Sequence, residues 1–276
     1  MIRLLFIGDI FGRPGRDLVR HGLAGLVEYH NVDLVIANAE NSAAGFGITR
    51  EIGDQLLETG IDVMTSGNHI WDKKEALDYI GAEPRLLRPI NYPAGVPGNG
   101  SYLARTKKGV SVGVINAMGR VFMLNIDDPF VVLSREIEAL RQRARVIFVD
   151  FHAEATSEKI AMGWYLDGKV TAVVGTHTHV QTADERILPK GTAYLTDVGM
   201  TGPHDSIIGV EIEAALSRFL TALPARFEAA TANPRLNAVI IEADEQTGRA
   251  TEIERLSYSA DELEQLSNVG SIRSTV

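Results

Sequence analysis

Short apolar runs alternate with amphipathic stretches over the first two-thirds of the chain, the pattern of strands that feed helices. The run 2–7 is apolar apart from Arg3, which is typical of a strand buried on both faces. Apolar residues then recur at helical spacing over 14–27. Thr49 is a suitable N-cap for a helix over 49–58. The pattern therefore predicts buried strands joined by surface helices.

The same signals place the other elements. Further strands are predicted at 34–37, 61–65, 101–105, 110–115, 146–149, 170–174, 192–196 and 238–243, and further helices at 128–143 and 157–166. The polar chain after about residue 259 is expected at the periphery. Because no repeat or linker interrupts the pattern, we expect one domain over 1–276. The mixture of β–α units and hairpins predicts an α/β sandwich, with helices outside mixed sheets.

Composition narrows the class of protein. Lys and Arg number 27 against 36 Asp and Glu, so the net charge is −9, which argues against stable DNA binding. No apolar run approaches the roughly 18 residues of a membrane span, and the first residues lead into a strand instead of a signal peptide. We therefore expect a cytoplasmic protein with no membrane partner. The absence of cysteine excludes disulfides, thiolate metal sites and a cysteine nucleophile.

Polar groups able to bind metal follow directly after five of the predicted strands. The five segments are 6–9, 36–41, 65–69, 149–152 and 174–179. Loops at the carboxyl ends of strands converge on a common crevice in α/β sheets. Four of the seven histidines fall in these segments: His69, His152, His177 and His179. Each segment alone is also compatible with an ordinary turn, but together they predict one site.

The donor types indicate a transition-metal site. Carboxylates, side-chain amides and imidazoles are the ligands of divalent Mn, Fe or Zn, and the lack of sulfur disfavours a structural zinc site. His177 and His179 stand two residues apart after a run of Val. Core histidines at both positions would need two separate partners, so a metal role is favoured.

Six motifs together resemble a known family. They are GDIFGRPGR (8–16), AENSAAGFGIT (39–49), TSGNHIWDKKE (65–75), DFHAEATSEK (150–159), GTHTHVQTAD (175–184) and TDVGMTGPHDSIIG (196–209). Their order is that of the calcineurin-like metallophosphoesterases, and they resemble the YmdB-type cyclic-nucleotide phosphodiesterases more closely. The resemblance implies an α/β/β/α metallophosphoesterase-like sandwich of two mixed sheets flanked by helices, covering nearly the whole chain.

Two positions depart from the wider superfamily. Phe11 stands where its first motif has His, and Glu40 stands where its bridging ligand is usually Asp. The YmdB-type pattern implies that Asn41 supplies the missing ligand. Carried over by resemblance, one metal would be held by Asp9, Glu40, Asn41 and His179. The other would be held by Glu40, Asn68, His152 and His177, with Glu40 as the bridge and His69 uncoordinated.

The resemblance implies hydrolysis of 2′,3′- and/or 3′,5′-cyclic nucleotides. A hydroxide bridging two divalent ions, with Fe or Mn expected and Zn as the alternative, would attack phosphorus. His69 would act as general acid for the leaving alkoxide, or would only bind a phosphate oxygen. We also expect a homo-oligomer.

Two other functions stay open at this point. A phosphomonoesterase would be favoured by extra Lys or Arg beside the ligands, and none of the five segments contains one there. A regulatory module that binds cyclic nucleotide or RNA without turnover would be expected to lack a ligand or the general acid. The sequence leaves the roles of Arg13, Phe46 and His204 open.

Overall fold

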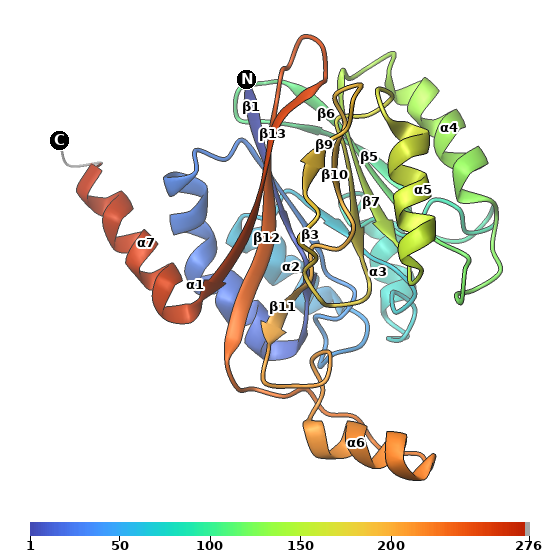
Figure 1. Cartoon of the computed structure of the whole chain (residues 1–276), viewed down its shortest axis with the longest axis vertical. Helices are drawn as coiled ribbons and strands as arrows, with labels where there is room; N and C mark the ends of the chain where they lie inside the picture. The colour runs from blue at the N-terminus through green and yellow to red at the C-terminus, as the bar shows by residue number, and fades with distance from the viewer. Residues whose placement is uncertain (274–276) are drawn as a thin grey trace.

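Two mixed β-sheets face each other in the computed structural model, which describes residues 1–273, with side chains described to residue 266 (Figure 1). The first sheet has the order β2–β11–β12–β1–β3–β4, and β13 pairs with β12. Its strands are β1 (Ile2–Ile7), β2 (Asp9–Ile10), β3 (Leu34–Asn38), β4 (Val63–Thr65), β11 (Met200–Pro203), β12 (Pro234–Ala243) and β13 (Ala250–Ser259).

The second sheet has the order β5–β6–β7–β8–β10–β9. Its strands are β5 (Ser101–Arg105), β6 (Ser111–Met118), β7 (Val146–His152), β8 (Ala172–Thr176), β9 (Arg186–Ile187) and β10 (Ala193–Leu195). The neighbours β6, β7, β8 and β10 run parallel, as do β1, β3 and β4. Each sheet therefore gathers several strand carboxyl ends at one edge.

Helices cover the outer faces of the two sheets. Those against the first sheet are α1 (Gly12–Tyr29), α2 (Arg50–Thr59), α3 (Ala76–Ala82) and α7 (Ala260–Arg273), and those against the second are α4 (Pro129–Leu140) and α5 (Thr156–Leu166). The remaining helix, α6 (Ile212–Thr221), projects from the foot of the molecule (Figure 1). The predicted α/β/β/α sandwich is confirmed.

Strand β1 shows why the first apolar run is continuous. Leu5 and Ile7 pack toward α1, whereas Leu4 and Phe6 lie in the core between the sheets. The ring of Phe6 meets that of Phe148 from the opposite sheet, with centroids 5.1 Å apart. A strand with apolar contacts on both faces needs apolar residues at every position.

Some boundaries differ from the sequence-based predictions. The helix capped by Thr49 is confirmed, since the Thr49 hydroxyl accepts the Ile52 amide at 3.3 Å. Strand β7 continues to His152, so this histidine belongs to the strand and not to a following loop. The segment expected as a peripheral tail forms α7, and its Leu263 is buried against Gly22 of α1, where a Cβ would come within 2.8 Å. In the part of the chain that the structure describes, no helix has both the length and the apolar character needed to cross a bilayer.

Candidate metal centre

Parallel strand pairing brings the polar segments together. Asn38 is opposite Thr65 in the β3–β4 pair, so the residues that follow these strands leave the sheet side by side. In the second sheet, His152 is opposite Thr176 at the ends of β7 and β8. Asp9 joins them from β2, which begins one residue after β1. The structure therefore places the candidate metal donors from the five segments at one edge of the sandwich.

The first group of donors consists of Asp9, Asn41 and His179. The Asn41 Nδ2 atom lies 3.5 Å from Asp9 Oδ1 and 3.2 Å from His179 Nε2, and the last atom is 3.8 Å from Asp9 Oδ1. His179 donates its Nδ1–H to the carbonyl of Ile208 at 2.8 Å, which leaves the Nε2 lone pair for the site. Asp9 is fully buried and Asn41 nearly so. Phe11, which replaces the superfamily histidine, packs its ring beside His179 at 5.6 Å.

The second group is centred on the Nε2 atom of His152. It lies 2.9 Å from Asn68 Oδ1, 3.0 Å from His177 Nδ1 and 3.0 Å from Glu40 Oε1. A ring nitrogen carries either one proton or one lone pair, so it cannot satisfy three such neighbours. Within the described part of the chain, the buried Glu40 Oε1 has no hydrogen-bond partner, because its approach to His152 lacks hydrogen-bond geometry. One cation between these four atoms would satisfy all of them, so the residues present fit a metal ion.

The charge balance also favours a cation here. Burial alone would lower the pKa of His152, but the carboxylates of Glu40 and Asp9 outweigh it and raise the pKa. For Glu40, burial would raise the pKa, but the His152 imidazole outweighs burial and lowers it. Burial and the charge on His152 lower the pKa of His177 to about 3. The carboxylates around the second group thus favour one positive charge there, which a metal ion would supply in place of a proton on His152.

Buried hydrogen bonds fix the orientation of His152. Thr176 donates its hydroxyl proton to Asp150 at 2.8 Å, so its oxygen accepts the Nδ1–H of His152 at 2.9 Å. The Nε2 lone pair therefore points at the candidate site. Asp150 also accepts a bond from Asn38 at 3.2 Å and thereby ties the two sheets together. The sequence pattern assigned Asp150 no role, although a carboxylate inside an apolar strand is itself a signal.

The two histidines of the His-Thr-His segment have unusual backbones. His177 has φ = 101° and His179 has φ = 66°, in the region that glycine favours. Each such conformation costs about 1–3 kcal/mol and persists only where the surroundings determine it. The Nε2 atom of His177 pairs with Glu154 Oε2 at 3.1 Å, so the Nδ1 atom is the one that faces the second group.

His69 stands beside both groups without belonging to either. Its backbone amide donates to Glu40 Oε2 at 2.8 Å, while its Nδ1 atom lies 2.7 Å from Asp72 Oδ2. The side chain is 30% exposed, and its ring meets that of Phe46 at 5.2 Å. The contact with Asp72 uses Nδ1, so Nε2 is the ring nitrogen that remains for a substrate.

A cavity of about 340 Å³ opens above the donor groups. Its lining comprises the polar residues Glu40, Asn41, His69, Glu154, His177, Thr178 and His179, with Phe11, Gly45, Phe46, Ile208, Val210 and Phe227. Neither Lys nor Arg is among the described residues that line it. The cavity combines a polar floor with apolar and aromatic walls, which is the usual composition of a small-molecule site.

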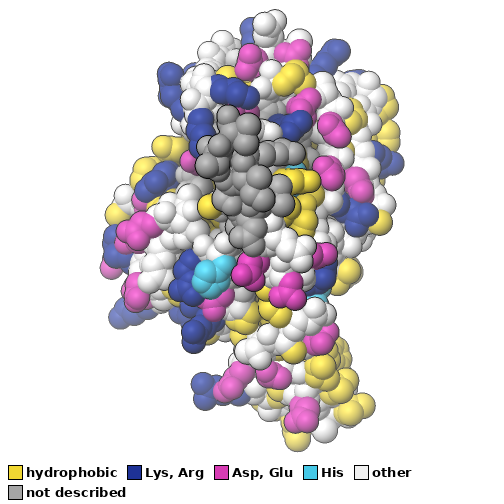
Figure 2. Space-filling view, turned by 90° about the vertical axis from the view of Figure 1, so that its left-hand side faces the viewer, with side chains coloured by type: hydrophobic (Ala, Val, Ile, Leu, Met, Phe, Trp, Pro, Cys, Tyr) yellow, Lys and Arg dark blue, Asp and Glu magenta, His cyan; other side chains and the backbone are white. Residues whose placement is uncertain are grey.

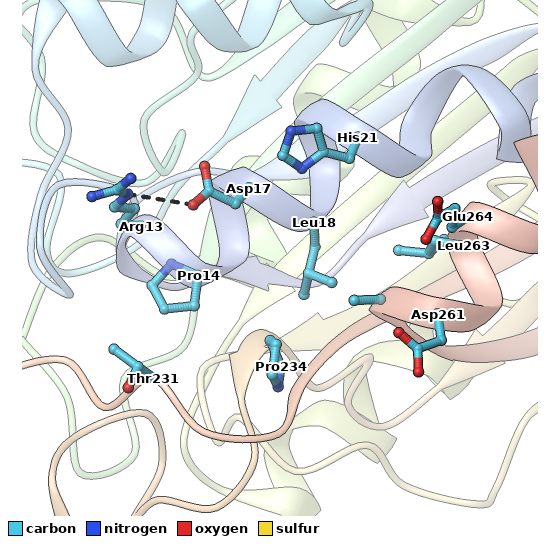
Figure 3. A pocket seen from close by; sticks show the side chains of 11 residues that line it. Arg13, Pro14, Asp17, Leu18, His21, Thr231, Pro234, Asp261, Leu263 and Glu264 are labelled. Atoms are coloured by element: carbon cyan, nitrogen blue, oxygen red, sulfur yellow. Dashed lines mark ion pairs between the residues drawn. The ribbon is translucent and has the colours of Figure 1, made fainter.

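A second, larger groove of about 680 Å³ lies between α1 and the start of α7 (Figure 3). It contains none of the donor residues described above. Arg13, whose side chain is 82% exposed, is drawn there in an ion pair with Asp17 at 3.4 Å. Because its charged groups are solvated and the grouped donor side chains lie elsewhere, the smaller cavity is the candidate site. Arg13 is therefore a solvated residue of the first helical turn and does not line the cavity.

The fold and the grouped donors together define an α/β protein of the metallophosphoesterase type. The sequence model of the YmdB-like proteins matches residues 5–256, and the chain belongs to that family. It is 50% identical over 262 residues to the Bacillus subtilis (strain 168) protein named 2′,3′-cyclic-nucleotide 2′-phosphodiesterase, covering 95% of this chain and 99% of that protein. The resemblance found in the motifs is thus confirmed.

Two solved structures have a fold similar to that of this chain. A hypothetical protein from Thermus thermophilus has a TM-score of 0.87 and 45% identity, covering 94% of this chain and 99% of that one. A novel phosphatase from Mycoplasma pneumoniae has a TM-score of 0.88 and 37% identity, covering 94% and 93%. The similarity in fold therefore extends over nearly the whole chain.

Proposed function

We propose that the protein is a metal-dependent phosphodiesterase that hydrolyses 2′,3′- and/or 3′,5′-cyclic nucleotides. The observation that carries this proposal is the pair of adjacent donor groups at the floor of the cavity, around the unpartnered Glu40 oxygen. The name of the Bacillus subtilis relative supports the same substrate class. Turnover of cyclic nucleotides by metal-stripped and metal-loaded protein tests the proposal.

The donor groups divide into two proposed metal sites. Asp9, Asn41 and His179 would hold one ion, and Asn68, His152 and His177 the other, with Glu40 shared between them. The donors suit Fe or Mn, with Zn as the alternative. Two divalent ions would supply an activated water as the nucleophile and neutralise charge on the phosphoryl group. With the two carboxylates counted, the centre keeps a charge of about +2, which attracts a phosphodiester despite the acidic surface.

The remaining residues of the cavity have roles of their own. His69 would donate a proton from Nε2 to the leaving alkoxide, with Asp72 orienting the ring through Nδ1. Phe46 and Phe227 offer aromatic surface to the nucleoside part of the substrate. Only the backbone amide of His69 contacts a proposed metal donor, Glu40, so the side chains of these residues are separable from metal binding.

A phosphodiester suits the cavity better than a phosphomonoester. A monoester carries more negative charge, and the described lining offers no Lys or Arg to meet it. It offers instead the carboxylate of Glu154, whose side chain is 49% exposed. A non-catalytic module is disfavoured because both donor groups and His69 are present together.

Replacing Glu154 tests this charge selection. In Glu154→Gln, the side-chain oxygen can still accept from His177, but the negative charge is gone. We expect the ratio of kcat/KM for a monoester to that for a diester to rise by up to about fivefold, the scale of a partly exposed charge interaction. The measurement is hydrolysis of matched nitrophenyl mono- and diesters. Glu28→Gln, which removes an exposed carboxylate from α1, should leave the ratio unchanged; an unchanged ratio in Glu154→Gln as well would refute the selection.

We also propose that the protein is a homo-oligomer assembled through α6. Apolar side chains on α6 and just after it are exposed. Figure 2 shows hydrophobic side chains gathered on the part of the molecule that projects at the bottom of the view. They are Ile212, Leu216, Phe219, Leu220 and Leu223. An amphipathic helix with an uncovered apolar side is typical of an interface.

A charge placed on α6 tests this assembly. Leu220 is 82% exposed, so Leu220→Glu should fold normally and lower the mass in light scattering toward 30.0 kDa. Glu213→Ala, on the same helix, should keep the wild-type mass. A wild-type mass of one chain, or an unchanged mass in Leu220→Glu, would contradict assembly through α6.

A further inference from the structure

The His-Thr-His segment holds two histidines, His177 and His179, in backbone conformations that need support from other residues. His177 and His179 belong to different donor groups, and both have the positive φ angles given above. Left to itself, a chain of three non-glycine residues would relax from this conformation, and neither ring nitrogen would then face its group. Some contact must therefore hold the residue between them, Thr178.

Asp197 provides that contact. Its Oδ2 atom accepts the Thr178 amide at 3.1 Å and the Thr178 hydroxyl at 2.7 Å, and its Oδ1 atom accepts the Gly199 amide at 2.8 Å. Asp197 is fully buried. One carboxylate thus accepts hydrogen bonds from both the backbone and the side chain of Thr178, the residue between the two histidines.

A buried lysine completes the arrangement. The ammonium of Lys159, on α5, lies 2.6 Å from Asp197 Oδ2, and Lys159 is the one lysine buried among the described residues. The two side chains are 2% and 0% exposed. Gly175 lets the chain pass close above them, because a Cβ there would lie 1.9 Å from the Thr196 carbonyl oxygen and 3.0 Å from Lys159 Cδ. A buried ion pair is weak evidence of stability by itself, so its place against Thr178 points to a role in the site.

We propose that Lys159, Asp197 and Thr178 form a positioning clamp that fixes His177 and His179 for both metals at once. Asp197 holds Thr178 in place, and Lys159 compensates the buried carboxylate so that it stays with Thr178. The inference rests on the proposed two-metal function. This clamp would orient ligands of both donor groups, whereas the contacts of Thr176 and Asp150 orient only His152 of the second group.

The clamp is tested by Thr178→Val, which keeps the shape of the side chain and removes only the hydroxyl donor. Loss of a contact that orients metal ligands typically weakens metal binding by about 10- to 100-fold. We expect a loss of this size for both ions when metal-free protein is titrated with Co²⁺, followed by calorimetry and by the visible spectrum of the bound metal. Thr178→Ser retains the hydroxyl and should restore most of the affinity.

Two further variants separate positioning from folding. Thr171→Val removes a buried hydroxyl that donates to Gly248 at 2.7 Å, at the far end of β8, and should keep wild-type Co²⁺ affinity. Lys159→Met combined with Asp197→Leu replaces the ion pair by apolar side chains, and should fold while binding Co²⁺ weakly at both sites. Wild-type protein that binds no Co²⁺ would overturn the proposed function. Wild-type protein that binds two ions, with Thr178→Val binding them equally well or losing affinity at one site only, would overturn the clamp alone.

Discussion

Purified Glu40→Gln protein should contain neither of the two metal ions expected in the wild type. Glu40 is fully buried, and its Oε1 atom has no hydrogen-bond partner among the residues that the structure describes. In the proposed centre this carboxylate is shared by both ions, so a neutral amide removes a charged ligand from each. Elemental analysis measures the metal content, and turnover of cyclic nucleotides should fall to background.

A buried glutamate elsewhere provides the control. Glu158 is 8% exposed, and its carboxylate accepts the amides of Arg120 and Val121 at 2.9 and 3.1 Å. Glu158→Gln should keep both metals even if its thermal stability falls. Full metal occupancy in Glu40→Gln would remove that residue from its bridging role.

His69→Ala should lower kcat on a cyclic nucleotide by about 10²- to 10⁴-fold, the usual contribution of a general acid. Metal content should not change, because His69 belongs to neither donor group. The loss should be much smaller for a p-nitrophenyl diester, since nitrophenolate leaves readily without a proton. Steady-state kinetics on the two substrates measure the contrast.

His21, an exposed histidine on α1, is the matched control, and His21→Ala should leave both reactions unchanged. A phosphate-binding role for His69 predicts a different result, in which both substrates suffer alike through KM. Equal losses on the two substrates, or a fall in bound metal, would take the general-acid role away from His69.

Periodicity was enough to predict most of the fold. Strand β1 is apolar apart from Arg3 because both of its faces are covered, and Thr49 caps α2 through a contact only three residues away. Helices α3, α6 and α7 were not predicted. The large apolar side chains of α6 are exposed, so they do not pack on the core of their own chain. The packing of α7 depends on the contact between Leu263 and Gly22, which lies far away in sequence.

The donor residues could be selected from sequence because each lies at the end of an apolar strand pattern or within a few residues after it. Their supporting residues could not. Asp72 supports His69 within one loop, but Asp150 acts on His152 through Thr176 of a neighbouring strand. Asp197 and Lys159 meet from a loop and a helix 38 residues apart. Such partners are fixed by tertiary packing, and among them only Asp150, a carboxylate inside an apolar strand, leaves a local signal in the sequence.

The most direct test of the central proposal is turnover by metal-stripped protein before and after metal is restored. The substrates are 2′,3′- and 3′,5′-cyclic nucleotides with matched aryl phosphate mono- and diesters, and the metals are Mn²⁺, Fe²⁺ and Zn²⁺. We predict no hydrolysis without metal, and restored hydrolysis of at least one cyclic nucleotide, with diesters preferred to monoesters, once about two ions per chain are bound. Hydrolysis that survives complete removal of metal, or restored activity confined to monoesters, would contradict the proposed function.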